Sequence, residues 1–292
     1  MVMPDFAYLR PGSLAEASAL ANRLGGDAAF IAGGTELIPD YHRARETARH
    51  LISLDGIGEL RGIAVEHGEL RVGALTTVAE VAASPLVRHR LEALADAARA
   101  IGSAQIRSLA TIGGNFCRAV ACADTPPAAI AGGARVHLSG PLGERDMAAE
   151  EFFVGPRRTV LAAGELLVAI TLPGQPNGTG SSYQRFSRRK GSSLAVAAVA
   201  VRLTLTRRRI SGARLALGAV GPVPLLVVSA AEMLEGELPS TTLFTRAAEQ
   251  CADAALPITD VRGSADFRRE LVRVLARRAL EEAVGRATGG QP

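Results

Sequence analysis

Two glycine pairs, Gly33-Gly34 and Gly113-Gly114, carry the clearest chemical signal in this sequence. Adjacent glycines let the backbone turn sharply and come close to a ligand. Successive N–H groups at such a turn form a concave site for an anion. Each pair alone is equally typical of an ordinary turn. Together they indicate either a diphosphate held between two loops or two unrelated turns.

Small hydrogen-bonding side chains flank both pairs. Thr35 follows the first pair directly, and Thr111 and Asn115 stand on either side of the second. Asp124 comes shortly afterwards, just before two prolines. Its carboxylate repels phosphate but accepts hydrogen bonds from ribose hydroxyls. The alternative interpretation is that Asp124 caps a helix that begins at the prolines.

Motifs for several other reactions are absent from the sequence. Residues 56–62 resemble a dinucleotide-binding glycine motif, but the spacing is too long and no helical pattern follows, so we interpret them as turn residues. The five histidines pair with no cysteine at zinc spacing. Cys117 and Cys122 are too few to hold an iron–sulfur cluster. We therefore expect no metal site in this chain.

The composition is typical of a soluble globular protein, since 48% of the 292 residues are hydrophobic and 21% are charged. A chain of this length suits two domains. The formal net charge is +4, and almost all of the basic residues are arginines. The densest basic run, 207–209, has no interleaved aromatic residues, which predicts a solvated hairpin tip. A nucleic-acid partner would rest on net charge alone.

The compartment can be predicted from what the sequence contains. Three cysteines in a chain of this length argue against a disulfide framework. Residues 1–5 do not have the pattern of a signal peptide. The longest apolar run, about 194–201, is far shorter than the ~20 residues that cross a bilayer. We therefore expect a cytoplasmic protein without a transmembrane segment.

The elements that must position the first glycine pair are well signalled. Ser13 and Glu16 form a capping box for a helix with apolar residues at helical spacing, and a glycine pair at 25–26 ends it. Residues 28–32 then form a short buried strand that runs into the turn. A helical segment is expected after the turn, to about Arg45.

Strands and helices alternate before the second pair. Thr77 and Glu80 form another capping box, and Pro85 opens a helix that should run to about Ala100. Residues 103–124 show little periodicity and much glycine, which predicts a functional loop. The predicted strands of the chain lie at 51–54, 69–74, 135–139, 166–172, 195–206 and 214–220.

The last part of the chain begins after a linker. Residues 173–180 are rich in proline and glycine, and we place a domain boundary there. The chain ends in a helix capped by Ser264, with apolar residues on one face and arginines on the other. This pattern predicts a solvated basic face.

Six segments have an order and spacing that are specific in combination: 32–37 (Ala-Gly-Gly-Thr-Glu-Leu), 73–77 (Gly-Ala-Leu-Thr-Thr), 111–115 (Thr-Ile-Gly-Gly-Asn), 151–157, 219–224 and 260–264. With them the chain resembles the FAD-binding medium subunit of the molybdenum hydroxylases. That family includes the flavoprotein subunit of aerobic carbon monoxide dehydrogenase and the flavin domain of xanthine dehydrogenase. The resemblance extends over nearly the whole chain.

The resemblance implies an α+β fold. Residues 1–176 should form a vanillyl-alcohol-oxidase-like (PCMH-type) FAD-binding domain with two lobes, about 1–55 and 56–176. Residues 177–292 should form a C-terminal α+β domain of the carbon monoxide dehydrogenase flavoprotein type.

The resemblance also implies roles for matching positions. The first loop should wrap the FAD pyrophosphate, the second should complete that cradle and reach toward the flavin, and Asp124 should meet the ribose or adenine side. Arg185 stands where relatives commonly carry a lysine near the flavin. The implied cofactor-binding residues are Phe30, Ile31, Ala32, Gly33, Gly34, Thr35, Glu36, Leu37, Ile101, Thr111, Gly114, Asn115, Asp124, Leu167 and Arg185.

Some relatives shield the flavin with an aromatic residue near position 193. This sequence has Ser192-Ser193-Leu194 there, so the resemblance leaves the exposure of the flavin and the electron acceptor open. The acceptor is NAD, a quinone or oxygen.

The implied function is electron relay in a multi-subunit enzyme. A molybdenum-cofactor large subunit should oxidise the substrate, and a [2Fe-2S] small subunit should pass the electrons to FAD in this chain. The subunits would form a heterotrimer or a dimer of heterotrimers. No side chain of this chain needs to act as acid, base or nucleophile. The alternative is a non-catalytic flavin-binding or assembly protein on the same fold.

Overall fold

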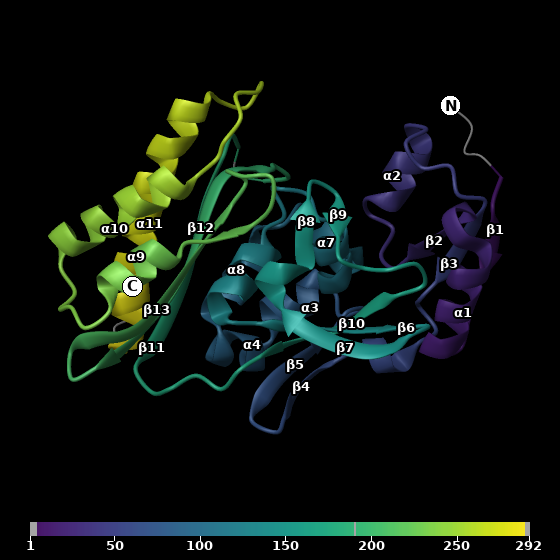
Figure 1. Ribbon diagram of the computed structural model, residues 1–292, viewed down its shortest axis with the longest axis horizontal. Helices are drawn as coiled ribbons and strands as arrows, with labels where there is room; N and C mark the ends of the chain where they lie inside the picture. The colour runs from purple at the N-terminus through teal and green to yellow at the C-terminus, as the bar shows by residue number, and fades with distance from the viewer. Residues whose placement is uncertain (1–4, 190, 290–292) are drawn as a thin grey trace.

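The computed structural model describes residues 5–189 and 191–289 and shows a mixed α/β protein of three parts along its longest axis (Figure 1). The prediction that residues 1–5 do not have the pattern of a signal peptide concerns residues that lie almost entirely outside these ranges. A small N-terminal lobe occupies one end, the C-terminal helices occupy the other, and a second lobe lies between them. No helix within the described ranges is long and apolar enough to cross a membrane.

The N-terminal lobe is built on a three-stranded parallel sheet in the order β1-β3-β2. Its first helix forms as predicted, because the Ser13 side chain accepts a hydrogen bond from the amide of Glu16 and Gly25 follows the last turn. The elements of this lobe are β1 (Ala7–Leu9), α1 (Leu14–Leu24), β2 (Ala28–Ile31), α2 (Leu37–His42) and β3 (His50–Ser53).

The second lobe is built on a five-stranded antiparallel sheet in the order β4-β5-β10-β6-β7. Its strands are β4 (Ile63–Glu66), β5 (Glu69–Gly73), β6 (Arg135–Gly140), β7 (Gly143–Ala148) and β10 (Leu166–Leu172), beside a small pair, β8 (Phe153–Gly155) and β9 (Arg158–Thr159). Its helices are α3 (Val78–Ala83), α4 (Pro85–Arg90), α5 (Glu92–Ala100), α6 (Ala104–Leu109), α7 (Ile112–Cys117) and α8 (Thr125–Gly132).

The C-terminal part combines a four-stranded antiparallel sheet with three helices that cover one face (Figure 1). The turn at 207–208 is a hairpin tip, as the basic run predicts. The strands are β11 (Thr179–Ser187), β12 (Ala195–Thr206), β13 (Arg209–Gly218) and β14 (Leu225–Leu226), and the helices are α9 (Val228–Leu234), α10 (Thr241–Ala254) and α11 (Ala265–Ala287).

Small aliphatic residues fill the core between the second lobe and the C-terminal sheet. Every residue of α8 is buried, and this helix contacts both β12 and β13. Alanine and glycine dominate α8, so the helix can approach the sheet closely. The C-terminal sheet therefore forms a fixed wall behind α8 and the segment that precedes it.

The predicted strand at 214–220 is shifted, since β13 spans 209–218, and the predicted linker 173–180 overlaps the start of β11, which was not predicted. Three predictions about helices were also wrong. The expected helix from Pro85 to Ala100 is two helices, because Leu91 has φ −157° and ψ 89° and interrupts the turn pattern. The expected loop 103–124 contains α6 and α7. The helical segment expected to about Arg45 ends at His42. Short helices of six residues show too little periodicity to be distinguished from loops.

The predicted solvated basic face of the last helix holds for Arg269 and Arg277, whose side chains are partly exposed, but not for Arg268. Arg268 is only 2% exposed and donates to the carbonyls of Val196 and Ala219 and to the Asp260 carboxylate. Hydrogen bonds from Arg262 and Arg268 hold the pKa of Asp260 below its ordinary value. Arg268 therefore joins α11 to two strand ends, and this role leaves no trace in the helical pattern.

Candidate functional site

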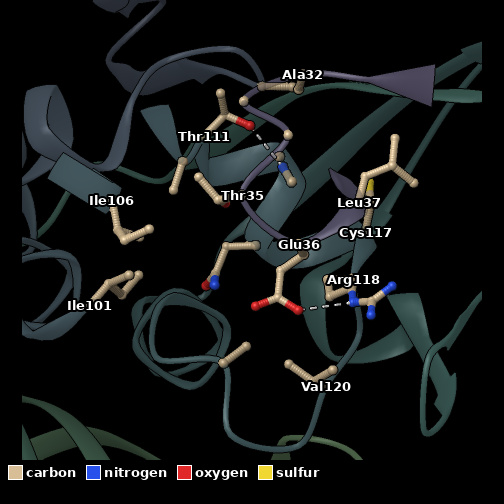
Figure 2. Close-up of a pocket in the computed structure, with 18 of the residues that line it drawn as sticks. Ala32, Thr35, Glu36, Leu37, Ile101, Ile106, Thr111, Cys117, Arg118 and Val120 are labelled. Atoms are coloured by element: carbon tan, nitrogen blue, oxygen red, sulfur yellow. Dashed lines mark hydrogen bonds and ion pairs between the residues drawn. The ribbon is translucent and has the colours of Figure 1, made fainter. Parts of the chain in front are cut away.

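One cavity of about 520 Å³ lies where the three parts of the molecule meet. Both glycine pairs line it, together with residues 192–194 from the connection between β11 and β12. Figure 2 shows Thr35 beside Thr111 in this cavity, with Ile101 and Ile106 on one side. The two glycine turns predicted as a joint site are therefore brought together.

The first glycine turn connects β2 to α2 and is forced by packing. A Cβ on Gly33 would lie 1.8 Å from the carbonyl oxygen of Leu109, so no other residue fits there without moving the backbone. Gly34 has φ +68°, the left-handed conformation that glycine adopts without strain. The end of α6 thus fixes the path of this turn along the cavity.

The turn offers unused donors. Within the described ranges, the amide N–H groups of Gly34, Thr35 and Glu36 donate to no protein acceptor. The carbonyl oxygen of Gly34, in contrast, accepts from the amide of Ile38 and begins the next helical turn. Successive free amides at a tight turn attract an anion. This turn is therefore suited to bind phosphate oxygens.

The second glycine turn is the first turn of α7, and its amides are already used. Thr111 caps this helix, and its hydroxyl oxygen accepts from the amide of Gly114 at 3.1 Å. The amide of Gly113 donates to the carbonyl of Ala74 at 2.9 Å. A Cβ on Gly113 would lie 2.7 Å from the Cβ of Ala74. This turn is pressed against the segment after β5 and forms a floor of the cavity.

Asn115 carries the polar side chain of this floor. Its Oδ1 accepts hydrogen bonds from the hydroxyl and amide of Thr125, at 2.6 and 3.3 Å. Because both bonds involve the amide oxygen, the Nδ2 group is left for a ligand in the cavity that Asn115 lines. The start of α8 therefore orients this side chain.

Arg118 connects the N-terminal lobe to the second lobe at the edge of the cavity. Its Nε lies 3.4 Å from the Glu36 carboxylate, a pair visible in Figure 2, and another guanidinium nitrogen pairs with Asp40. The Asp40 side chain is buried, and Arg157 approaches the same carboxylate at 3.6 Å. Since Glu36 and Asp40 follow the first glycine turn, these ion pairs hold that turn against α7.

Asp124 lines the cavity, but its carboxylate is hydrogen-bonded to two side chains that do not line it. Oδ1 accepts from the Tyr183 hydroxyl at 2.7 Å and from Arg185 at 2.8 Å. Burial raises the pKa of the Asp124 carboxyl, although Arg185 and Tyr183 act to lower it. Burial and Asp124 raise the pKa of Tyr183. Asp124 occupies the N-cap position of α8, as the alternative interpretation predicts, but its side chain makes no capping hydrogen bond and is instead engaged by Tyr183 and Arg185.

Two thiols, Cys117 and Cys122, line the cavity. Cys117 is exposed, whereas Cys122 is half-buried. Burial raises the pKa of the Cys122 thiol, and a raised pKa favours the protonated, less reactive form. Among the described residues, no group of three or more His, Cys, Asp or Glu side chains is placed to hold a metal ion.

The structure places most of the predicted binding residues on the cavity surface. Two do not line it: Ile31 packs its side chain toward Gly34, and Arg185 lies behind Asp124. The predicted residues that line the cavity are Phe30, Ala32, Gly33, Gly34, Thr35, Glu36, Leu37, Ile101, Thr111, Gly114, Asn115, Asp124 and Leu167.

Several lining residues were missed by the sequence analysis. Ile106 lies on α6, in a segment that was expected to be a loop, and Arg118 follows the second turn directly. Leu161 lies in the segment before β10, and Leu166 is the first residue of β10. The sequence could have indicated Arg118 as a site residue, because it lies close to the second glycine pair. Ile106, Leu161 and Leu166 are ordinary apolar residues that nothing in the sequence distinguishes.

Comparison with known proteins gives two family matches that agree with each other, one over the N-terminal two lobes and one over the C-terminal part. Residues 4–175 match the family described as the FAD binding domain in molybdopterin dehydrogenase. Residues 181–283 match the CO dehydrogenase flavoprotein C-terminal domain.

Individual relatives match over almost their full length. The carbon monoxide dehydrogenase medium chain of Hydrogenophaga pseudoflava is 36% identical, with 98% of this chain and 99% of the relative covered. The putative xanthine dehydrogenase FAD-binding subunit of Escherichia coli is 31% identical over the same shares. A chain in the solved structure of the Hydrogenophaga pseudoflava carbon monoxide dehydrogenase superposes with a TM-score of 0.95 at 35% identity, covering 98% of this chain and 99% of that one.

Proposed function

Since this chain belongs to the FAD-binding flavoprotein family of the molybdopterin dehydrogenases, we propose that it binds FAD in the central cavity and serves as the electron-transfer subunit of a molybdenum-containing hydroxylase or dehydrogenase. Its partners are a molybdenum-cofactor large subunit and a [2Fe-2S] small subunit. Bound FAD supplies the redox chemistry, because its ring takes up electrons and gives them to another acceptor.

The observation that carries the proposal is the free donor set of the first glycine turn. The amides of Gly34, Thr35 and Glu36 have no protein acceptor within the described residues, and Gly33 lets the backbone lie against α6. Phosphate oxygens of a diphosphate satisfy such amides. Asn115 faces the same space from the opposite turn. The residues present therefore fit the diphosphate of FAD.

The apolar end of the cavity suits the flavin ring. Ile101, Ile106, Leu167 and Leu194 are among the aliphatic residues that line the cavity. A flat ring system buried among aliphatic side chains is shielded from water and held in one orientation. We assign the task of this chain to binding and orienting the cofactor and excluding water from it.

Two further assignments belong to the same proposal. We divide the chain into an FAD-binding domain, 1–176, and a C-terminal domain, 177–292. The two family matches end and begin on either side of that point. We also place the protein in the cytoplasm.

The test is to isolate the complex through a tag on this chain and identify the released cofactor by chromatography. We expect a yellow preparation that contains FAD rather than FMN, about one per chain. A complex that is colourless and stays colourless after incubation with FAD contradicts the proposal. If FAD binds but is not reduced when substrate reduces the partner clusters, the chain is the non-catalytic flavin-binding or assembly protein instead.

A further inference from the structure

The guanidinium of Arg185 joins two walls of the cavity without lining it. Arg185 lies on β11, and one of its terminal nitrogens donates to both oxygens of Asp124, at 2.8 and 3.0 Å. The other donates to the carbonyl oxygen of Ser193 at 2.8 Å. Asp124 and Ser193 both line the cavity. Arg185 is thus a buried brace between the α7–α8 connection and the segment Ser192–Leu194.

We propose that Arg185 is a positioning residue that fixes Ser192–Leu194 as a wall of the flavin pocket and thereby limits solvent access to the bound ring. The proposal rests on the FAD-binding function above. It assigns no contact between Arg185 and the cofactor. The effect on the ring passes through the backbone of Ser193.

The wall segment has few other supports. Ser192 has φ +43°, a conformation that costs energy for a residue with a side chain. Its amide reaches the carbonyl of Gly102 only at 3.4 Å. Leu194 is 58% exposed, so packing does not hold it. Arg189 also donates to the carbonyl of Ser192, at 2.7 Å, but this bond is exposed to water. The bond from Arg185 is therefore the side-chain restraint on this strained segment that is largely protected from water.

The brace is itself well anchored. The side chains of Arg185 and Asp124 are 12% and 8% exposed, so their ion pair is largely protected from water. Tyr183 lies two residues before Arg185 on the same face of β11 and donates to the same carboxylate. Asp124 thus has two partners, but Ser193 has only Arg185 among the described side chains.

The planar guanidinium serves two acceptors in different directions, and a lysine cannot do the same. Lysine places one nitrogen where arginine places two. Arg185→Lys keeps a positive charge beside Asp124, so the buried carboxylate remains paired. It removes the separate donor to Ser193. This substitution therefore separates the role of charge from the role of the brace.

The matched control is Tyr183→Phe. It removes a hydrogen bond to Asp124 from the same cluster but leaves the hydrogen bonds of Arg185 to Asp124 and Ser193 in place. Tyr183 does not line the cavity. A general loosening of the cluster changes both variants alike, whereas loss of the brace changes only Arg185→Lys.

The first measurement is hydrogen exchange of the full chain without FAD. In Arg185→Lys we expect the amide of Ser192, which donates to the carbonyl of Gly102, to exchange roughly tenfold faster, the factor expected when one hydrogen bond from a charged donor no longer holds the segment closed. Tyr183→Phe should leave the exchange of this amide unchanged. Equal exchange in the wild type and Arg185→Lys, or equal acceleration in both variants, overturns the proposal.

The second measurement uses the FAD-loaded complex and iodide quenching of flavin fluorescence. We expect the quenching constant to rise several-fold in Arg185→Lys and to stay at the wild-type value in Tyr183→Phe. An unchanged constant in Arg185→Lys contradicts the proposal. If the wild-type complex binds no FAD, the proposed function fails, while the exchange experiment still tests the brace.

Discussion

The two glycine turns look equivalent in the sequence but do different work in the structure. At the first turn the amides of Gly34, Thr35 and Glu36 are free, whereas at the second Gly113 and Gly114 both donate to protein acceptors. The first turn therefore offers hydrogen bonds to a ligand. The second offers a surface that a ligand can approach closely, with the polar side chains of Thr111 and Asn115 on it.

The members of each pair also differ. Gly33 and Gly113 have no room for a side chain, because each lies against the backbone of a neighbouring segment. Gly34 is required by its positive φ. A Cβ on Gly114 would meet only the Thr111 hydroxyl, at 3.0 Å, and Gly114 lines the cavity. Three of the four glycines are thus required by the fold through packing or a positive φ, whereas Gly114 is not.

The largest expected effect comes from Gly33→Ala. The new Cβ overlaps the Leu109 carbonyl oxygen at 1.8 Å, and backbone must move to relieve it. We expect a loss of about 3 kcal/mol or more in the free energy of unfolding, measured by urea titration. Gly26→Ala is the control, because nothing lies within 4 Å of its Cβ. Equal stability of the two variants would show that α6 does not fix the turn.

An intermediate effect is expected in amide exchange when FAD binds. The free amides of Gly34, Thr35 and Glu36 should become protected by roughly tenfold to a hundredfold, as each gains a hydrogen bond to a charged oxygen. Gly113 and Gly114 should change little, since their amides are bonded already. Nuclear magnetic resonance or mass spectrometry can follow both turns at once. Equal protection at both turns would remove the difference between them.

The smallest effect on stability should come from Gly114→Ala. Alanine favours the helix by about 0.5–1 kcal/mol over glycine, so the free energy of unfolding should hold or rise slightly. Because Gly114 lines the cavity, FAD affinity should fall about tenfold or more in a flavin-fluorescence titration. Retained affinity would show that the cofactor does not approach this turn closely.

Local patterns predicted much of this molecule because capping and turn formation involve neighbouring residues. The Thr77–Glu80 capping box, the hairpin tip at 207–208 and the strand before Gly33 all follow from short stretches of sequence. The six-residue helices α6 and α7 did not, because one and a half turns show no clear periodicity.

The sequence by itself determined which residues were available to the site: two glycine pairs, their hydroxyl and amide neighbours, and an acidic residue after them. The tertiary structure alone decided their tasks. Asp124 and Arg185 are 61 residues apart, and Arg268 meets strand ends 49 and 72 residues away. The pattern of hydrophobic residues predicts which face of one helix or strand is buried. Which polar side chains meet in the core depends instead on how separate helices and strands pack together. That packing left one glycine turn with free donors and filled those of the other.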